Sequence, residues 1–156
     1  MRSVMLAAGL AAALMPVGAD SKRAPAPVPA VGERFACSVT RVYDGDGPIH
    51  CAEGPKVRLH GIAAREMNGE CRPGHPCPRA SAQEAKMALT RMTLGQRLTC
   101  EATGKSYQRV VALCWTPAGR EVNCAMVEGG YALSWDSYQR VHTICGRLPT
   151  ARDRRR

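Results

Sequence analysis

The chain has 156 residues, which is enough for one domain with a single core. Its 22 Lys and Arg outnumber 13 Asp and Glu and give a net charge of +9, which favours anionic partners such as nucleic acid, phosphates or membrane surfaces. The same charge is equally typical of a protein that it merely keeps soluble, and no stretch is long and apolar enough to cross a bilayer comfortably.

The first 19 residues have the pattern of a secretory signal peptide. One positive charge, at Arg2, precedes an apolar run over residues 4–17, and small residues stand at the cleavage positions up to Ala19. We therefore expect an exported protein, either periplasmic or secreted, with no transmembrane segment in its mature form. The composition divides the chain into a signal peptide at 1–19, a Pro-rich tether at 20–34, a folded domain at 35–145 and a basic tail at 146–156.

Eight cysteines lie in the predicted domain, and an even number in an oxidising compartment predicts disulfides. Eight cysteines allow 105 connectivities. Two pairs straddle predicted hairpins, a third would close a small loop, and the fourth is what remains. The favoured pairs are Cys37 with Cys51, Cys100 with Cys114, Cys71 with Cys77 and Cys124 with Cys145. A zinc knuckle at residues 71–77 is the alternative for the third pair, but a fourth ligand is missing there.

The first half of the domain has the pattern of a three-stranded meander. Residues 35–43 are β-branched and alternate in polarity, which predicts a strand, and tight turns separate two further strands at 49–52 and 56–62. In the third strand a period of two places Arg58 and His60 on the polar face. We interpret His60 as a surface histidine beside the site, although it could supply a ligand to zinc or manganese.

The second half predicts a helix, two strands and a short helix. Ser81 and Glu84 form a capping box at the start of the first helix, and Gly95 ends it. Strands follow at 97–102 and 110–116, and a short helix at 122–128. Five short strands with an inserted helix predict a β-barrel with helices, a Greek-key barrel of the OB type.

Four separated segments resemble the staphylococcal nuclease (thermonuclease) family in order and spacing: residues 39–46, 57–66, 105–109 and 122–132. The resemblance implies an OB-fold endonuclease that requires calcium and cleaves phosphodiester bonds of DNA and RNA. It also implies a role for each matched residue. Asp46 would bind calcium, Arg58 and Arg109 would hold the phosphate, and Glu66 would activate the attacking water. Guanidinium groups suit this task because they stabilise the charge of a phosphoryl transition state.

The chain departs from the family pattern beside these residues. Ala63 stands where a second calcium-binding carboxylate is expected, Gly47 follows Asp46, and Gln108 precedes Arg109. Calcium binding should therefore be weak, even if the backbone of Ala64 contributes, because calcium affinity depends on the number of charged ligands. We hypothesise that Arg65, which adds a positive charge at this edge, binds phosphate and partly replaces the metal.

Two functions remain open at this point. The first is an exported nuclease with a weakened or altered metal requirement, acting as a monomer without an organic cofactor. The alternative is a catalytically impaired OB-fold protein that binds DNA, RNA or another polyanion, but few aromatic residues are available for stacking bases. A purely structural disulfide module would leave Arg58, Glu66 and Arg109 unexplained.

Overall fold

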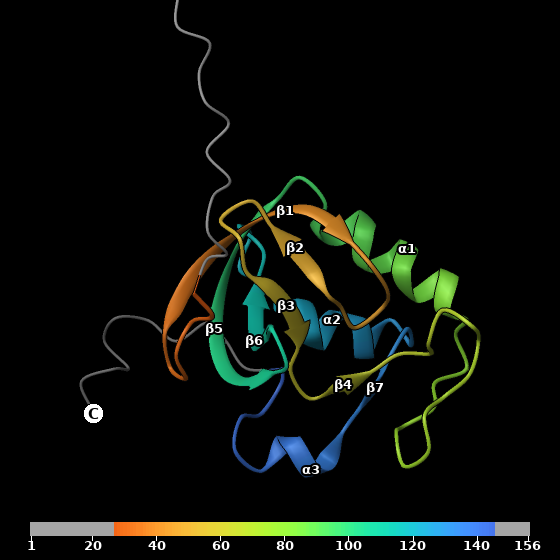
Figure 1. The fold of residues 1–156 in the computed structure, drawn as a ribbon. Helices are drawn as coiled ribbons and strands as arrows, with labels where there is room; N and C mark the ends of the chain where they lie inside the picture. Colours follow the sequence, from red (N-terminus) through yellow and green to blue (C-terminus); the bar gives the residue numbers. More distant parts are fainter. Residues whose placement is uncertain (1–26, 146–156) are drawn as a thin grey trace, which may run out of the picture.

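The computed structural model describes residues 27–145, and its centre is a closed β-barrel (Figure 1). The strands neighbour one another in the order β1-β2-β3-β6-β5, and only β3 and β6 pair in parallel. Their bounds are β1 Arg34–Val42, β2 Ile49–Cys51, β3 Lys56–Leu59, β5 Arg97–Ser106 and β6 Arg109–Trp115. The barrel and its strand order confirm the predicted OB-type fold.

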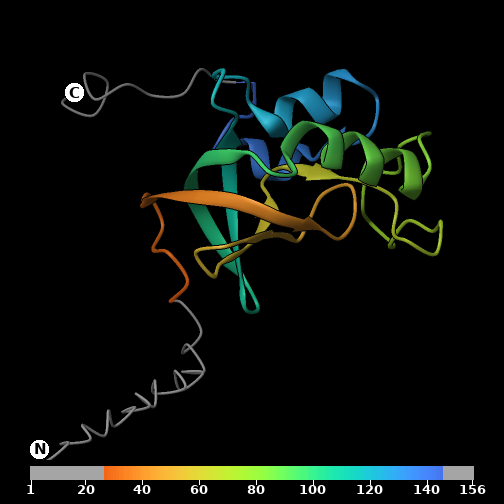
Figure 2. The ribbon, with the colours of Figure 1, turned by 90° about the horizontal axis from the view of Figure 1, so that it is seen from above.

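Three helices and a two-stranded sheet complete the part of the chain that the structure describes. The helices are α1 Ala82–Thr93, α2 Val122–Glu128 and α3 Asp136–Gln139, and the small sheet pairs β4 Ile62–Ala63 with β7 Leu133–Ser134. Helices α1 and α2 lie side by side at one end of the barrel, as both ribbon views show (Figures 1 and 2). Arg41 on β1 and Lys56 on β3 remain exposed on the outside of the barrel.

Alternation along β3 and β6 separates the core from the outer surface. Val57, Leu59, Val110 and Ala112 point inward and are no more than 1% exposed. Helix α1 seals one end of this core with its buried alanines, and its predicted capping box is present, with Ser81 and Glu84 each bonding the backbone of the other. The residues between the buried positions on β3 and β6 consequently face solvent.

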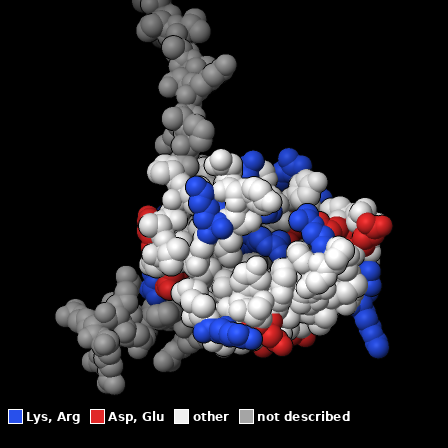
Figure 3. Space-filling view, turned by 60° about the horizontal axis from the view of Figure 1, so that its bottom comes forward, with Lys and Arg blue, Asp and Glu red and all other residues white. Residues whose placement is uncertain are grey.

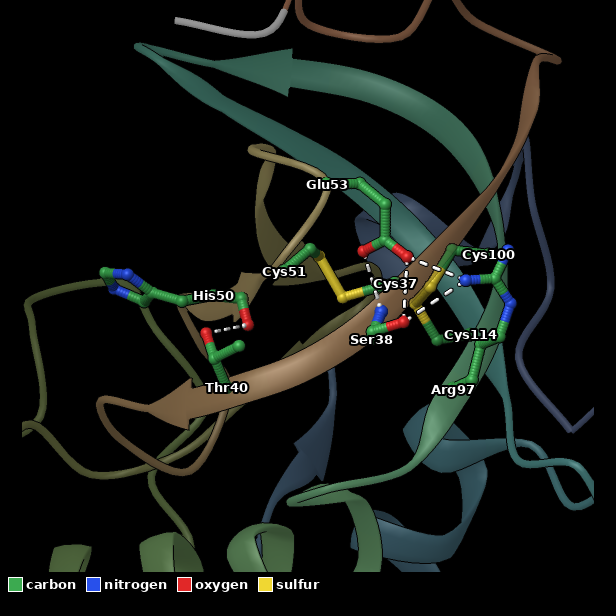
Figure 4. Close-up of a disulfide and its surroundings, with 9 residues drawn as sticks. All are labelled: Cys37, Ser38, Thr40, His50, Cys51, Glu53, Arg97, Cys100 and Cys114. Carbon is green, nitrogen blue, oxygen red and sulfur yellow. Dashed lines mark hydrogen bonds and ion pairs between the residues drawn. A yellow bond between two sulfur atoms is a disulfide. The ribbon is translucent and has the colours of Figure 1, made fainter. Parts of the chain in front are cut away.

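All four favoured cysteine pairs form disulfides, and no free cysteine remains among residues 27–145. The bond between Cys37 and Cys51 joins β1 to β2, and the bond between Cys100 and Cys114 joins β5 to β6 (Figure 4). Each of these two closes a loop whose ends are 14 residues apart, a length for which a disulfide contributes about 3 kcal/mol to stability. Such a framework indicates an oxidising environment.

The third predicted strand, at 56–62, is too long. The strand β3 ends at Leu59, and the chain turns at Gly61, whose φ of +68° is readily adopted only by glycine. A side chain at this position would also collide with Gln139 of α3. Because the strand has ended, the residue after Leu59 does not follow the alternation that placed it on the polar face.

The interpretation of His60 as a surface histidine is therefore wrong, since its side chain is only 5% exposed. Its Nε2 lies 3.1 Å from the carbonyl oxygen of Tyr138 and 2.9 Å from that of His142. Its Nδ1 lies 2.9 Å from the hydroxyl of Thr103 on β5. Two carbonyl acceptors assign the proton to Nε2, so the ring ties the segment after α3 to the barrel.

This burial predicts a pH-dependent stability. Loss of solvation lowers the pKa of His60 below its ordinary value of 6.5, against the opposing effect of the two carbonyls. The contribution of His60 should be complete above pH 6.5 and be lost as the pH falls through the lowered pKa of the folded state. Denaturant unfolding at a series of pH values should give a steeper loss of stability on acidification in the wild type than in His60→Gln. Equal slopes would contradict this.

The structure describes part of the predicted N-terminal tether. Residues 27–33 of the predicted tether lie against the barrel, where the Gly32 amide donates to the carbonyl of Ala102 on β5 at 2.8 Å. The signal peptide at 1–19 and the basic tail at 146–156 lie outside the described residues. None of the helices within residues 27–145 is long and apolar enough to cross a membrane.

Candidate functional site

Arg58 and Arg109 share the outer face of one pair of parallel strands. In the register of β3 and β6, Arg58 lies opposite Val111, and Arg109 stands two residues before Val111. Side chains two residues apart in a strand point to the same face. Both arginines are therefore diagonal neighbours on the outside of the barrel, and both are partly exposed.

Asp46 holds the guanidinium of Arg58. The Asp46 Oδ1 accepts a hydrogen bond from Arg58 Nη1 at 2.7 Å, and its Oδ2 accepts one from the Ala64 amide at 3.2 Å. The Asp46 side chain is 10% exposed and that of Arg58 is 20% exposed, so solvent screens this ion pair little. Asp46 therefore fixes the orientation of the Arg58 guanidinium group.

The turn that carries Asp46 packs tightly under α1. A β-carbon on Gly45 would collide with the side chains of Ala85 in α1 and Ala64, so only glycine allows this close approach. Asp44 on the same turn is buried, and its Oδ1 accepts a hydrogen bond from the Asp46 amide at 3.2 Å. Burial first, and then the charge of Asp46, raise the pKa of Asp44 to about 7. Two crowded carboxyl groups thus occupy this turn, and one of them, Asp46, pairs with Arg58.

Arg58 also lines a cavity of about 180 Å³ that has aromatic and cationic walls. Trp135 and Tyr138 form one wall, with ring centroids 4.9 Å apart, and Lys105 and Ser106 belong to the other. The Ser106 hydroxyl accepts a hydrogen bond from Arg109 Nη2 at 3.2 Å. Arg109 is thereby anchored to a residue that lines the cavity beside Arg58.

Glu66 lies in a different cavity. Its Oε1 pairs with Arg72 Nε at 2.7 Å, and both residues line a space of about 380 Å³ together with Tyr43 and Met67. Glu66 is near enough to Asp44 for its charge to raise the pKa of that carboxyl further. The structure thus brings Arg58 and Arg109 together and places Glu66 next to the Asp44 turn, paired with an arginine that the sequence did not single out.

Arg65 is directed toward the loop that precedes α1. Its Nε donates to the carbonyl of Pro78 at 2.9 Å, and its Nη1 donates to the carbonyl of Gly69 at 3.0 Å. Neutral carbonyls leave the charge of the guanidinium uncompensated. Arg65 therefore anchors this loop, and it is not among the residues that line the cavity of Glu66 or the cavity of Arg58.

The oxygen atoms around Asp46, with Asp44 as the neighbouring carboxyl group, form an incomplete ligand set for a calcium ion. Calcium takes six to eight oxygen ligands, but both oxygens of Asp46 already accept hydrogen bonds, and position 63 offers a methyl group. The Ala64 amide, rather than its carbonyl, faces Asp46. No cluster of three or more His, Cys, Asp or Glu residues that could hold a metal occurs within residues 27–145.

Sequence reasoning missed the surroundings of these residues. The cavity beside Arg58 depends on Trp135 and Tyr138, which β7 and α3 bring to β3 from 77 and 80 positions further along the chain. Arg72 sits in the disulfide-closed loop, where no periodicity indicates its direction. The three-residue spacing of Trp135 and Tyr138, just after the second predicted helix, is the only sequence signal that could have pointed to the aromatic wall.

The sequence model of one protein family, described as staphylococcal nuclease homologue, matches residues 56–152. The matched region begins at β3 and includes Arg58, Glu66 and Arg109, and it leaves out the turn of Asp44 and Asp46. A search of curated proteins finds no match.

Proposed function

Because the chain belongs to the staphylococcal nuclease homologue family, we propose that it is an exported phosphodiesterase that cleaves DNA or RNA with little dependence on calcium. The observation that carries this proposal is the common outer face of Arg58 and Arg109, which adjoins a cavity with aromatic walls. The negative charge of a phosphodiester allows hydrogen bonds from the two guanidinium groups. The flat face of a nucleobase allows stacking on the rings of Trp135 and Tyr138. The disulfides and the signal-peptide pattern support export.

In this proposal the two arginines bind the scissile phosphate. Arg58 uses one terminal nitrogen for Asp46, which leaves its remaining N–H donors for phosphate oxygens. Arg109 is oriented by Ser106 and contributes a second fork. Both hold positive charge where negative charge develops on the equatorial oxygens, without reorganisation during the reaction. Asp46 and Ser106 act as positioning residues for the two guanidinium groups.

Glu66 is proposed as the base. When Arg72 releases it, the carboxylate can accept a proton from a water molecule that attacks phosphorus. The new P–O bond forms as the bond to the leaving sugar oxygen breaks, and that oxygen takes a proton from solvent. Arg65, which bonds the carbonyls of Pro78 and Gly69, is proposed to hold the loop beside Glu66 in place and to add positive charge that attracts phosphate.

Removing calcium should change substrate binding little. The charges that attract phosphate in this site come from arginines, and the donor set offers calcium no complete coordination shell. The dissociation constant of a single-stranded oligonucleotide should therefore stay within about twofold when excess chelator replaces calcium. Fluorescence anisotropy at fixed ionic strength measures this, and a tenfold or larger tightening at micromolar calcium would contradict it.

The proposed activity is tested with the oxidised protein and two substrates, plasmid DNA and single-stranded RNA, with calcium, manganese or chelator. Cleavage that disappears in Glu66→Gln and survives in Glu70→Gln, a nearby carboxylate in the same cavity, would support the assignment. Equal cleavage by wild type and Glu66→Gln would reject Glu66 as the base. An Arg65→Ala variant should cut more slowly, because it loses both a charge and the loop anchor.

One observation favours a second function, a catalytically impaired nucleic-acid binder. Glu66 is ion-paired with Arg72 and lines a cavity that does not include Arg58. If this pair persists with substrate bound, the arginines still hold phosphate but no base is available. Measuring both affinity and cleavage distinguishes the two functions. A nucleic-acid binder without activity keeps an oligonucleotide affinity that depends on Arg58 and shows no cleavage with calcium, manganese or chelator.

A further inference from the structure

A row of basic residues crosses the outer face of the barrel. Arg41 on β1 pairs with His50 on β2, and His50 pairs with Lys56 on β3. Because Val57 pairs with Val110 in parallel, the register places Lys56 beside Arg109 on β6. His50 and Lys56 have buried strand neighbours, whereas Arg41 follows exposed Thr40 at an irregularity in the pairing of β1 with β2, and both Arg41 and Lys56 are exposed. The row therefore runs from the proposed phosphate site across three further strands.

The electrostatics of His50 agree with this arrangement. Partial burial first, and then the charges of Lys56 and Arg41, lower the pKa of His50 below its ordinary value of 6.5. Both cations must lie close to the imidazole to have this effect. In the close-up, the His50 ring extends away from the disulfide that joins β1 and β2 (Figure 4). The three side chains thus form one local group of basic residues.

The positive charge of this row is not neutralised nearby. Neither Arg41 nor Lys56 forms an ion pair within the described part of the chain. The acidic residue of the turn between β2 and β3, Glu53, is directed to Ser38 and Arg97, as Figure 4 shows. The space-filling view shows basic and acidic side chains interspersed over the face that it presents (Figure 3).

We propose that Arg41, His50 and Lys56 form a binding track for the sugar-phosphate backbone of a single-stranded nucleic acid, continuous with Arg109. This proposal rests on the proposed function and adds to it the length of substrate that the protein holds. Neighbouring strands are about 4.8 Å apart, so the three steps from Arg41 to Arg109 cover about 14 Å along the surface. At the duplex rise of about 3.4 Å per nucleotide this distance equals about four steps along a strand, and a more extended single strand covers it in fewer.

An anionic membrane is a poorer partner for this track. Stable binding to a lipid surface needs buried apolar area in addition to positive charge. The position beside Arg41 that faces outward carries Thr40, whose hydroxyl bonds the carbonyl of His50 at 3.1 Å. Among the exposed large hydrophobic residues within residues 27–145, only Tyr43 lies within two positions of Arg41, His50 or Lys56 in the sequence. Nucleic acid requires only regularly spaced charge, which the row supplies.

The test compares the double variant Arg41→Ala/Lys56→Ala with Lys86→Ala/Arg91→Ala, which removes the same charge from α1. Affinity is measured in a Glu66→Gln background, which keeps the oligonucleotide intact, for a dinucleotide and a 12-residue single strand at several salt concentrations. The track variant should bind the 12-mer at least tenfold more weakly and lower its salt slope by about 1.4, at about 0.7 per phosphate. The dinucleotide should bind all three proteins equally.

Equal losses in the track variant and the α1 variant would overturn the proposal, because net charge alone would then explain them. Loss of binding to anionic phospholipid vesicles with unchanged 12-mer affinity would also overturn it. The outcome is separable from that of the proposed function. If the wild type never cleaves but the track variant loses affinity for the 12-mer and not for the dinucleotide, the track is supported and the nuclease activity is not. If the wild type cleaves and the track variant binds the 12-mer as the wild type does, the nuclease activity is supported and the track is not.

Discussion

Replacing Arg58 by Ala is expected to lower kcat/KM for an oligonucleotide by about 10²- to 10³-fold, the usual effect of removing one donor to a transition-state oxyanion. Arg58 Nη1 donates a hydrogen bond to Asp46 Oδ1 at 2.7 Å. The same side chain lines the cavity that contains Trp135 and Tyr138. Arg58→Lys should recover only part of the loss, because an ammonium group cannot bind two phosphate oxygens as a planar fork. Steady-state kinetics measure both variants.

The matched control is Arg97→Ala, which removes an exposed arginine that is ion-paired with Glu53 at 2.9 Å on another part of the barrel. Its kcat/KM should stay within twofold of the wild type, because Arg97 contacts Glu53 and Ser38 and not the proposed site. Its stability should also change little, because an exposed ion pair contributes about 1 kcal/mol or less. Arg58→Ala also leaves Asp46 without its partner, so thermal unfolding must show that the variant is folded. A folded Arg58→Ala protein with wild-type kinetics would reject the phosphate-binding role.

Replacing Asn123 by Ala is expected to lower the free energy of unfolding by about 3–5 kcal/mol, one of the largest single effects in the described domain. Asn123 belongs to α2 and is fully buried against β6 and the residue that follows β3. Its Oδ1 accepts from the Cys114 amide at 3.1 Å, and its Nδ2 donates to the carbonyls of His60 at 2.9 Å and Ala112 at 3.1 Å. Truncation leaves the Cys114 amide and the His60 carbonyl without these partners.

Asn68 provides the control for this prediction. It also makes two side-chain hydrogen bonds, both to Glu70, but in an exposed loop where water can replace them. Asn68→Ala should change stability by less than about 0.5 kcal/mol. Denaturant unfolding of the oxidised proteins measures the two variants under the same conditions. Similar losses at both positions would show that the bridge between β3, β6 and α2 is not what stabilises this region.

The fold was predictable where local patterns suffice. Alternation at residues 35–43 and the Ser81 capping box act within a few residues, so β1 and α1 appear close to their predicted bounds. Cysteines that straddle hairpins face each other once the hairpins form, which explains the correct pairing of Cys37 with Cys51 and of Cys100 with Cys114. These features need no knowledge of distant parts of the chain.

The rest depends on contacts between distant segments. The sheet of β4 and β7 has two residues in each strand, too few for any periodicity, and it forms because the chain returns after α2. His60 appears polar by alternation, but α3 and the segment after it bury the ring. Glu66 was assigned a role from a resemblance, and its pairing with Arg72 depends on a loop that local rules do not orient.

The central claim is that Arg58 and Arg109 hold one and the same phosphate on the outside of the barrel. A double-mutant cycle tests it most directly, with the affinity of a dinucleotide measured for the wild type, Arg58→Ala, Arg109→Ala and the double variant. Convergence on a single phosphate predicts a coupling energy above about 1 kcal/mol, because the second loss then costs less than the first. Losses that add to within about 0.5 kcal/mol would place the two guanidinium groups on separate ligands and contradict the claim.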